Sequence, residues 1–244
     1  MKMPATLNEQ LKYLKLPFIR QHHTALSQQA AKEQWPPAKL LQQLITGEIQ
    51  LRADQSALSR IKAARFPFIK TLADFDWNWP TSINQELVRH LGELDFITQG
   101  ANVVFLGGVG LGKSHLGIAL AHQACLQGYR VRFISAIDMV NQLHQLKGAA
   151  FESQLKKFIK PALLQVDEIG YLPIDQTGAD VLFQIISKRY DLKRSTIFTS
   201  NLVFSEWQTI FRNDAKTTSA ILDRILHRCH TIEIQGRSFR TKQD

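Results

Sequence analysis

The chain has 244 residues, of which 44% are apolar, which is enough for a globular protein with one large domain and a small one attached. Its two cysteines, Cys125 and Cys229, cannot build the disulfide framework of a small secreted protein, and no stretch has the length and apolar character of a signal peptide or a membrane span. We therefore expect a soluble cytoplasmic protein that has no membrane partner.

The net charge of +9 is concentrated in the first part of the chain. Residues 1–70 contain 11 Lys and Arg against 4 Asp and Glu, a balance of +7, whereas residues 71–244 contribute only +2. A basic segment attached to a nearly neutral body favours a polyanionic partner such as nucleic acid, because binding releases condensed counterions. A solvated helix face would show the same charge pattern, so charge alone leaves both interpretations open.

Residues 1–68 are expected to form a small helical domain. Leu7, Leu11 and Leu14 recur at helical spacing, and residues 40–49 continue an amphipathic pattern after the proline break in "WPP". A basic cluster near the end of this domain is a candidate for DNA contact, and it consists of Arg60, Lys62 and Arg65.

The segment "FPFIKTLADFDWNWP", residues 66–80, follows the helical domain. It is rich in aromatic residues and is bounded by prolines. So many large rings would not be left in water, so we expect this linker to pack on the surface of the second domain, residues 69–244.

Strand and helix patterns alternate from residue 102 onward. Strands are predicted at 102–107, 129–135, 162–169, 195–201 and 231–234, and helices at 113–127, within 136–160, and at 177–190, 205–211 and 217–229. This alternation predicts an α/β fold in which helices cover both faces of a parallel sheet.

The first strand and helix are joined by "GGVGLGKS", residues 107–114, which matches the pattern G-x-x-x-x-G-K-[ST]. Its glycines let backbone N–H groups point at phosphate oxygens, and the helix N-terminus adds its positive dipole. Lys113 is placed to reach the β- and γ-phosphates, and Ser114 to bind Mg²⁺. A glycine-rich turn without a ligand is the alternative. The predicted ATP-binding residues are Gly107, Gly108, Val109, Gly110, Leu111, Gly112, Lys113, Ser114 and His115.

Two later strands end in polar residues. In "LLQVDEIG", Asp167 is the candidate Mg²⁺ ligand and Glu168 the candidate base that activates a water for attack on the γ-phosphate. An acidic pair that caps a helix would look the same in isolation. In "TIFTSN", Asn201 could orient the attacking water, although asparagine at such a position is more often a turn residue. No N-K-x-D sequence follows the loop, so we expect ATP rather than GTP.

The order of these elements resembles the AAA+ ATPases, and more narrowly the IstB-type helper ATPases of insertion-sequence transposition. The resemblance covers nearly the whole chain through "LKYLKLPFIRQ", "IKAARFPFIKTLADFDW", "GGVGLGKSHLGIALAHQA", "VDEIGYLP", "SKRYDLKRSTIFTSNLVFSEW" and "AILDRILHRCHTIEIQGRSFR". It implies an ATP- and Mg²⁺-dependent ATPase that assembles on double-stranded DNA, deforms it, and recruits or activates an IstA-like transposase. The N-terminal domain would contact the transposase and help assembly.

Two arginines acquire roles from this resemblance. Arg224 in "LDRI" matches the family's arginine finger, which enters a neighbouring subunit's ATP site, and Arg240 in "GRSFR" matches the second sensor of the chain's own site. Arg228 and Arg237 match no such role. A finger that works between subunits implies a homo-oligomer with head-to-tail contacts, which form a ring or a spiral.

The resemblance also assigns residues 136–161 to a helical insertion that steers spiral assembly and faces DNA. Its candidate phosphate contacts are Lys156, Lys157 and Lys160, with a solvated helix face as the alternative. Only four residues follow Arg240, so a C-terminal helical lid is expected to be minimal or absent. Two other functions stay open, a DnaC-like helicase loader that prefers single-stranded DNA and a small-molecule P-loop kinase that is indifferent to DNA.

Overall fold

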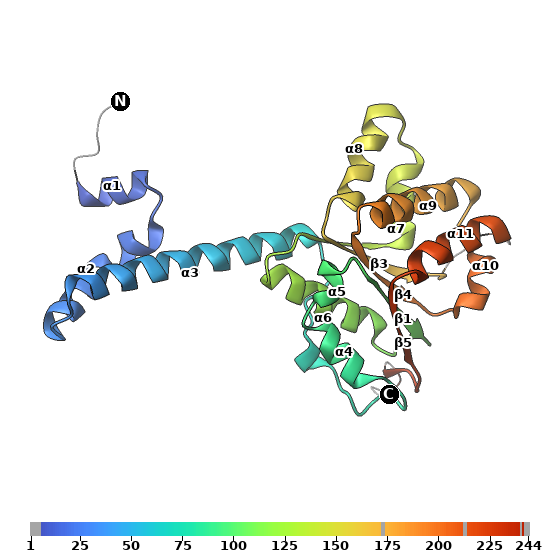
Figure 1. Ribbon diagram of the computed structural model, residues 1–244, viewed down its shortest axis with the longest axis horizontal. Coiled ribbons are helices and arrows are strands. Elements are labelled where there is room, and N and C mark those ends of the chain that lie inside the picture. Colours follow the sequence, from blue (N-terminus) through green and yellow to red (C-terminus); the bar gives the residue numbers. More distant parts are fainter. Residues whose placement is uncertain (1–5, 172–173, 212–213, 240, 242–244) are drawn as a thin grey trace. The chain divides into compact units, whose positions relative to one another are not determined.

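The computed structural model describes residues 6–171, 174–211, 214–239 and 241 (Figure 1). The chain forms two compact units, Met1–Ser59 and Arg60–Asp244. The sequence predicts a division at residue 68 instead. The roles that it implies for the two parts stay predictions.

The first unit is helical. It contains α1 (Leu7–Tyr13), α2 (Pro17–Lys32) and the part of α3 (Pro37–Ala64) that ends at Ser59. The side chain of Thr6 accepts a hydrogen bond from the Glu9 amide and Glu9 binds back to the Thr6 amide, so a capping box starts α1. Pro17 and Pro37 stand at the first positions of their helices, where the missing N–H costs no hydrogen bond.

A buried carboxylate ties α2 to α3. Glu48 is only 4% exposed, and its Oε2 accepts hydrogen bonds from the amides of Phe18 at 2.9 Å and Ile19 at 3.3 Å. These amides lie in the first turn of α2, where the N-cap residue Leu16 offers no side-chain acceptor. Arg52 donates to the other oxygen, Oε1, at 3.2 Å. Glu48 therefore caps a helix that lies thirty residues away in the sequence.

The second unit is an α/β domain. Its elements are η1 (Leu72–Asp74), α4 (Gln85–Leu91), α5 (Asp95–Thr98), β1 (Asn102–Gly107), α6 (Lys113–Leu126), β2 (Val131–Ser135), α7 (Ala136–His144), α8 (Gly148–Ile159), β3 (Leu163–Ile169), α9 (Gln176–Asp191), β4 (Ser195–Ser200), η2 (Phe204–Glu206), α10 (Trp207–Ile210), α11 (Ala215–Leu226) and β5 (Cys229–Ile234). The five strands pair in parallel in the order β2-β3-β4-β1-β5, which confirms the predicted parallel sheet.

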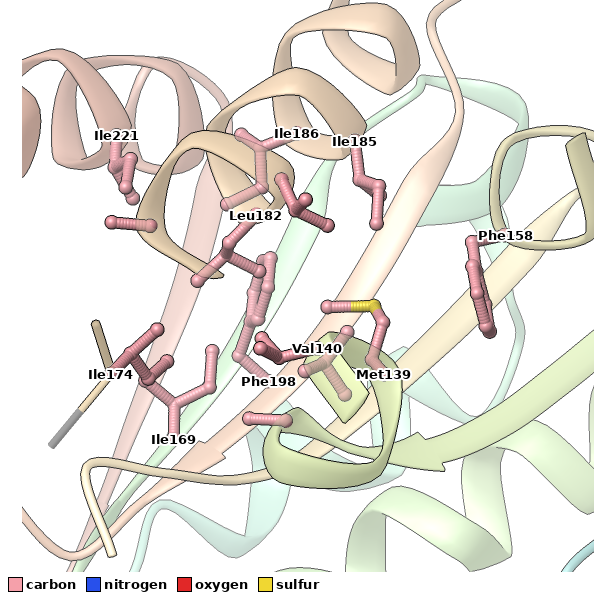
Figure 2. Close-up of a cluster of buried hydrophobic side chains, with 14 of the residues drawn as sticks. Met139, Val140, Phe158, Ile169, Ile174, Leu182, Ile185, Ile186, Phe198 and Ile221 are labelled. Carbon is pink, nitrogen blue, oxygen red and sulfur yellow. The ribbon is translucent and has the colours of Figure 1, made fainter. Parts of the chain in front are cut away.

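Both faces of the sheet are buried. Val103 and Phe105 of β1 belong to a core with α4, α5 and α6, whereas Val104 and Leu106 belong to a core with α7 to α11. Alternate residues of a strand point to opposite faces, and all four are at most 2% exposed. Figure 2 shows the second core, where side chains of α7, α9 and α11 meet those of β3 and β4. This double burial explains why the strands read as nearly continuous apolar runs.

The differences from the sequence-based elements are local. β2 begins at Val131 rather than Tyr129, because the Tyr129 amide closes the end of α6 by donating to the Ala124 carbonyl at 2.9 Å. The helix expected over 217–229 ends at Leu226. The short helices α4 and α5 fall in residues 81–101, which carried no prediction.

Candidate ATP-binding site

The phosphate loop joins β1 to α6, and glycine is required at both of its ends. Gly107 has φ of 148° and Gly112 has φ of 84°, which are values that side-chain-bearing residues rarely adopt. A Cβ on Gly107 would collide with the carbonyl oxygen of Ile234 on β5, and one on Gly112 would lie 2.5 Å from the ring of Phe75. The loop leads directly into the N-terminus of α6. The first amides of this helix have no intrahelical partner and can bind an anion.

The two polar residues that start α6 lie at this N-terminus. The Lys113 ammonium donates a 2.7 Å hydrogen bond to the Gly108 carbonyl, so its charge lies across the loop. The Ser114 hydroxyl lies close enough to the carboxylate of Asp167 on β3 to lower the pKa of that group. The structure thus brings together Lys113, Ser114 and Asp167, which the sequence placed about fifty residues apart.

A β-bulge presents the two acids of β3. Val166 pairs with Phe198 and Ile169 with Ser200, so between these pairs β3 has Asp167 and Glu168 where β4 has a single residue. In a regular strand, consecutive side chains point to opposite faces. A bulge breaks this alternation, and bulges are frequent beside active sites.

Glu168 carries the backbone distortion of the bulge. Its φ is 61°, in the left-handed region, and its side chain is exposed. Such a conformation costs a non-glycine residue about 1–2 kcal/mol. The neighbouring Asp167 is 7% exposed. One carboxylate is therefore buried beside Ser114 while the next one faces solvent at the edge of the sheet.

Thr199 on β4 is a site residue that the sequence analysis missed. It is 1% exposed, and its hydroxyl donates to Asp167 Oδ1 at 2.6 Å and accepts from the Glu168 amide at 2.9 Å. One side chain therefore positions both acids. Asn201, the residue predicted from the same segment, is exposed in the turn after β4. A polar residue inside an apolar strand was the available signal, because buried hydroxyl groups need partners.

Burial dominates the electrostatics of Asp167. Desolvation raises the pKa of its carboxyl above the ordinary Asp value, while the hydrogen bond from Thr199, the nearby Ser114 hydroxyl and the charge of Lys113 act in the opposite direction. A cation bound at this carboxylate would remove the cost of keeping it charged. Asp167 is therefore suited to hold a metal ion.

The donor set fits Mg²⁺. In the part of the chain that the structure describes, no group of three His, Cys, Asp or Glu side chains could hold a metal. Mg²⁺ does not need such a group, since it is commonly bound through one or two protein oxygens, substrate phosphates and water. Ser114 and Asp167 supply those oxygens.

Residues outside the predicted motif pack against the phosphate loop. Phe75, in the aromatic segment 66–80, is 9% exposed and lies edge-on to His115 with ring centroids 5.3 Å apart. The His115 Nε2 lies 2.8 Å from the Thr71 carbonyl oxygen, so this nitrogen carries the hydrogen. Desolvation by burial is the main cause that lowers the pKa of His115. The predicted packing of this segment on the second unit is confirmed, and the His115 side chain is used in that packing.

The segment after β5 also contacts the loop. The Phe239 amide donates to the Gly110 carbonyl at 2.9 Å, and the Trp79 indole N–H donates to the Arg237 carbonyl at 2.8 Å. The rings of Trp79 and Phe239 lie edge-on, 5.2 Å apart. Arg240, the predicted second sensor, lies outside the described residues.

The chain that carries this site is similar to known proteins. Residues 9–244 match the family model described as IstB-like ATP binding protein. The chain belongs to this family. It is 34% identical over 242 residues to the ATP-binding protein of insertion sequence IS5376 from Geobacillus stearothermophilus, with 99% of this chain and 96% of that protein covered. It is 37% identical over 234 residues to the corresponding protein of IS21 from Pseudomonas aeruginosa, with 96% and 88% covered.

Solved structures share the fold of this IstB-like chain. The DnaI structure has a TM-score of 0.57 at 19% identity, covering 72% of this chain and 92% of that one. AMPPCP-bound DnaA from Aquifex aeolicus has a TM-score of 0.56 at 22% identity, covering 71% and 52%. At these identities the likeness establishes the fold alone, a parallel sheet flanked by helices. Among the described residues, no helix is both long enough and apolar enough to cross a bilayer.

Arg224, the predicted arginine finger of this IstB-like chain, lies far from the chain's own phosphate loop. It stands in the last turn of α11, where it donates to the Ala220 carbonyl at 2.9 Å and its guanidinium lies 4.8 Å from the ring centre of Phe183. It lines a cavity together with Asn102, the first residue of β1. The phosphate loop follows Gly107 at the other end of that strand, roughly 17 Å away at the usual rise per residue.

The six candidate DNA contacts lie in different settings. Arg60 donates through Nε to the Cys125 carbonyl at 2.7 Å, near the C-terminal end of α6, so this guanidinium is used within the second unit. Lys62 and Arg65 are exposed around the end of α3. Three lysines are exposed on α8 and at its C-cap, namely Lys156, Lys157 and Lys160.

Proposed function

We propose that this protein is an ATPase that assists insertion-sequence transposition. In this proposal it assembles head to tail on double-stranded DNA, deforms the DNA, and recruits or activates a transposase. Its family and the insertion sequences named for its relatives support the transposition context. The basic balance of its first 70 residues supports a nucleic-acid partner.

One observation carries the proposal. Lys113, Ser114, Asp167 and Glu168 gather at the carboxyl edge of the sheet, whereas Arg224 lies beside the amino end of β1. An arginine side chain is shorter than the six-residue strand β1, so Arg224 cannot serve the phosphate loop of its own chain. A second copy that presents its Arg224 would complete the site.

The chain's own residues then divide the work of hydrolysis. The loop amides and Lys113 bind the phosphates, and Glu168 takes a proton from the attacking water. Thr199 holds Glu168 and Asp167 in place. Mg²⁺ held through Ser114 and Asp167 would neutralise charge on the phosphates.

Arginines from two copies would stabilise the charge that develops on the γ-phosphate. A fixed guanidinium in this role is worth about 10³-fold or more in rate. Arg224 would come from the neighbouring copy. Arg240 would come from the chain itself, and the bond from the adjacent Phe239 amide to the Gly110 carbonyl supports that role.

DNA deformation would follow from the repeated phosphate contacts of successive subunits. Bending a duplex has an elastic cost of a few kcal/mol per site, which many weak phosphate contacts from successive subunits can offset. The exposed residues available for such contacts are Lys62, Arg65, Lys156, Lys157 and Lys160.

A complementation experiment tests the composite site. Arg224→Ala should bind ATP normally and hydrolyse it poorly, and so should Glu168→Gln. In mixed assemblies on DNA, an intact site of the Arg224→Ala chain meets the intact finger of the Glu168→Gln chain, so turnover should exceed the sum of the two separate rates. No gain, although mixed assembly is confirmed by cross-linking, would place Arg224 outside the reaction.

A comparison of DNA substrates tests the transposition role. ATP-dependent assembly should be stronger on duplex DNA than on single strands, as judged by sedimentation or electron microscopy. A preference for single strands, together with binding to a replicative helicase, would support a helicase loader instead. ATP turnover that needs a small-molecule acceptor and ignores DNA would support a kinase.

A further inference from the structure

A cavity of about 210 Å³ lies at the amino ends of β1 and β4, away from the phosphate loop. Asn102 and Thr196 line it from the sheet, and Ile186 and Tyr190 line it from α9. The ATP site described above uses the opposite ends of the same strands. The cavity is therefore separate from the chain's own phosphate loop.

The lining of this cavity is strongly cationic. Among the described residues that line it, five are Lys or Arg and one is acidic, namely Arg189, Lys193, Arg194, Arg224 and Arg228 against Asp191. None of the ion pairs within 4.0 Å among the described residues involves any of these cations. Like charges gathered around one cavity raise the local positive potential.

The most buried of these cations has only neutral partners. The Arg189 guanidinium is 1% exposed and donates to the Phe158 carbonyl at 2.8 Å, to the Thr196 hydroxyl at 2.9 Å and to the Ser195 carbonyl at 2.5 Å. Burial, and secondarily the charge of Arg194, lower the pKa of Arg189 to about 9, so it stays protonated at neutral pH. A buried cation without a counter-ion is costly, and an anion in the cavity would offset that cost.

We propose that this cavity binds a phosphate-class oxyanion, with Arg194 and Arg228 as its adjustable ligands. Both side chains are exposed, and both are attached to backbone that is fixed at the cavity's edge. The Arg194 amide donates to the Arg189 carbonyl at 2.9 Å, and the Arg228 carbonyl accepts from the Asn102 amide at 2.7 Å. One guanidinium group can donate two parallel hydrogen bonds to phosphate oxygens, so two guanidinium groups can hold one phosphate group.

The size of the cavity limits the ligand. Pockets for whole small-molecule ligands are usually about 300–1,000 Å³, so this one suits a phosphate or pyrophosphate group rather than a complete nucleotide. A cavity of this size does not admit a duplex. Two sources supply such a group, namely free phosphate and the phosphate chain of a nucleotide on a second copy. The second source rests on the proposed head-to-tail assembly, because Arg224 lines the same cavity.

The binding test uses the full chain with its phosphate loop silenced by Lys113→Ala. Inorganic pyrophosphate should still bind, as measured by calorimetry and by the rise in Tm. Adding Arg194→Gln and Arg228→Gln should weaken that binding about tenfold or more, as expected when charge-assisted hydrogen bonds are removed. The control pair Lys12→Gln and Lys32→Gln removes the same charge from exposed positions of the first unit and should leave binding unchanged. Equal weakening by both pairs, or no pyrophosphate binding in the Lys113→Ala chain, would overturn the proposal.

A second arm identifies the source of the phosphate group. With Lys113 intact, the Arg194→Gln and Arg228→Gln chain should bind ATP normally. If the ligand is a neighbour's nucleotide, its DNA-stimulated turnover falls and recovers on mixing with Glu168→Gln. If the ligand is free phosphate, turnover is unchanged and inhibition by added phosphate disappears. The first arm needs no assembly, so failure of the head-to-tail model is distinguishable from failure of the cavity site.

Discussion

Thr199 donates a 2.6 Å hydrogen bond to the carboxylate of Asp167 across the pairing of β3 with β4. The same hydroxyl accepts from the Glu168 amide at 2.9 Å, at the one place where the register of these strands shifts. A single buried hydroxyl therefore couples the predicted metal ligand to the predicted base.

Thr199→Val should uncouple the two acids while keeping the shape of the side chain. We expect ATP binding to change little and kcat to fall about 10- to 100-fold, because a hydrogen bond to a charged group is worth about 1.5–3 kcal/mol. Thr199→Ser keeps the hydroxyl and should retain most of the activity. Steady-state hydrolysis and nucleotide binding measured on both variants check this. Equal activity of the two variants would show that the hydroxyl has no role.

Asp167→Asn should stabilise the nucleotide-free protein at neutral pH while it abolishes Mg²⁺-dependent hydrolysis. Burial raises the pKa of Asp167 in the folded state, so the folded protein binds a proton more tightly than the unfolded chain does. The charged carboxylate therefore destabilises the folded protein fully at pH values above the raised pKa. This destabilisation vanishes as the pH falls below the ordinary pKa of Asp. The gain in Tm of Asp167→Asn should shrink over that same interval. A gain independent of pH would assign the effect to packing.

Glu168→Gly should release the strain of the bulge. Glycine adopts the φ of 61° found at Glu168 without a steric cost, whereas alanine does not. We expect Glu168→Gly to be more stable than Glu168→Ala by about 1 kcal/mol in urea unfolding, although both lose hydrolysis. If the alanine variant were the more stable, the left-handed conformation at this residue would not persist in solution.

Glu48→Ala should loosen the start of α2. The amides of Phe18 and Ile19 lose their acceptor, which costs about 1 kcal/mol for each of these partly buried donors. In the full chain, hydrogen exchange at these two amides should accelerate about tenfold or more, while amides of the α/β domain keep their protection. Arg52→Ala is the matched control, because it removes the ion pair and leaves the cap. Unchanged protection of Phe18 in Glu48→Ala would contradict the capping role.

The three residues of the basic cluster around the end of α3 should have different functions. Lys62→Gln with Arg65→Gln should lower the slope of log affinity for DNA against log salt by about 0.9 for each phosphate that the protein no longer neutralises. Arg60→Gln should leave that slope unchanged and should lower Tm, because the Cys125 carbonyl loses its donor. DNA binding measured over a range of salt concentrations checks both. A slope that falls with Arg60→Gln alone would make Arg60 a residue that binds phosphate.

The sequence by itself determined the order along the chain of the strands and main helices after residue 101, the phosphate loop and the acidic pair of β3. These are local properties, since an apolar run, a glycine pattern and a helix start depend on residues that are neighbours in the chain. The tertiary structure alone decided that Thr199 contacts Asp167, because strand register and a bulge depend on pairing between distant segments. It also decided that Glu48 caps α2 and that Arg60 is used at the end of α6. The tertiary structure likewise decided that Arg224 lies far from its own phosphate loop. The two lie near opposite ends of β1, and no local pattern in the sequence places Arg224 at either end.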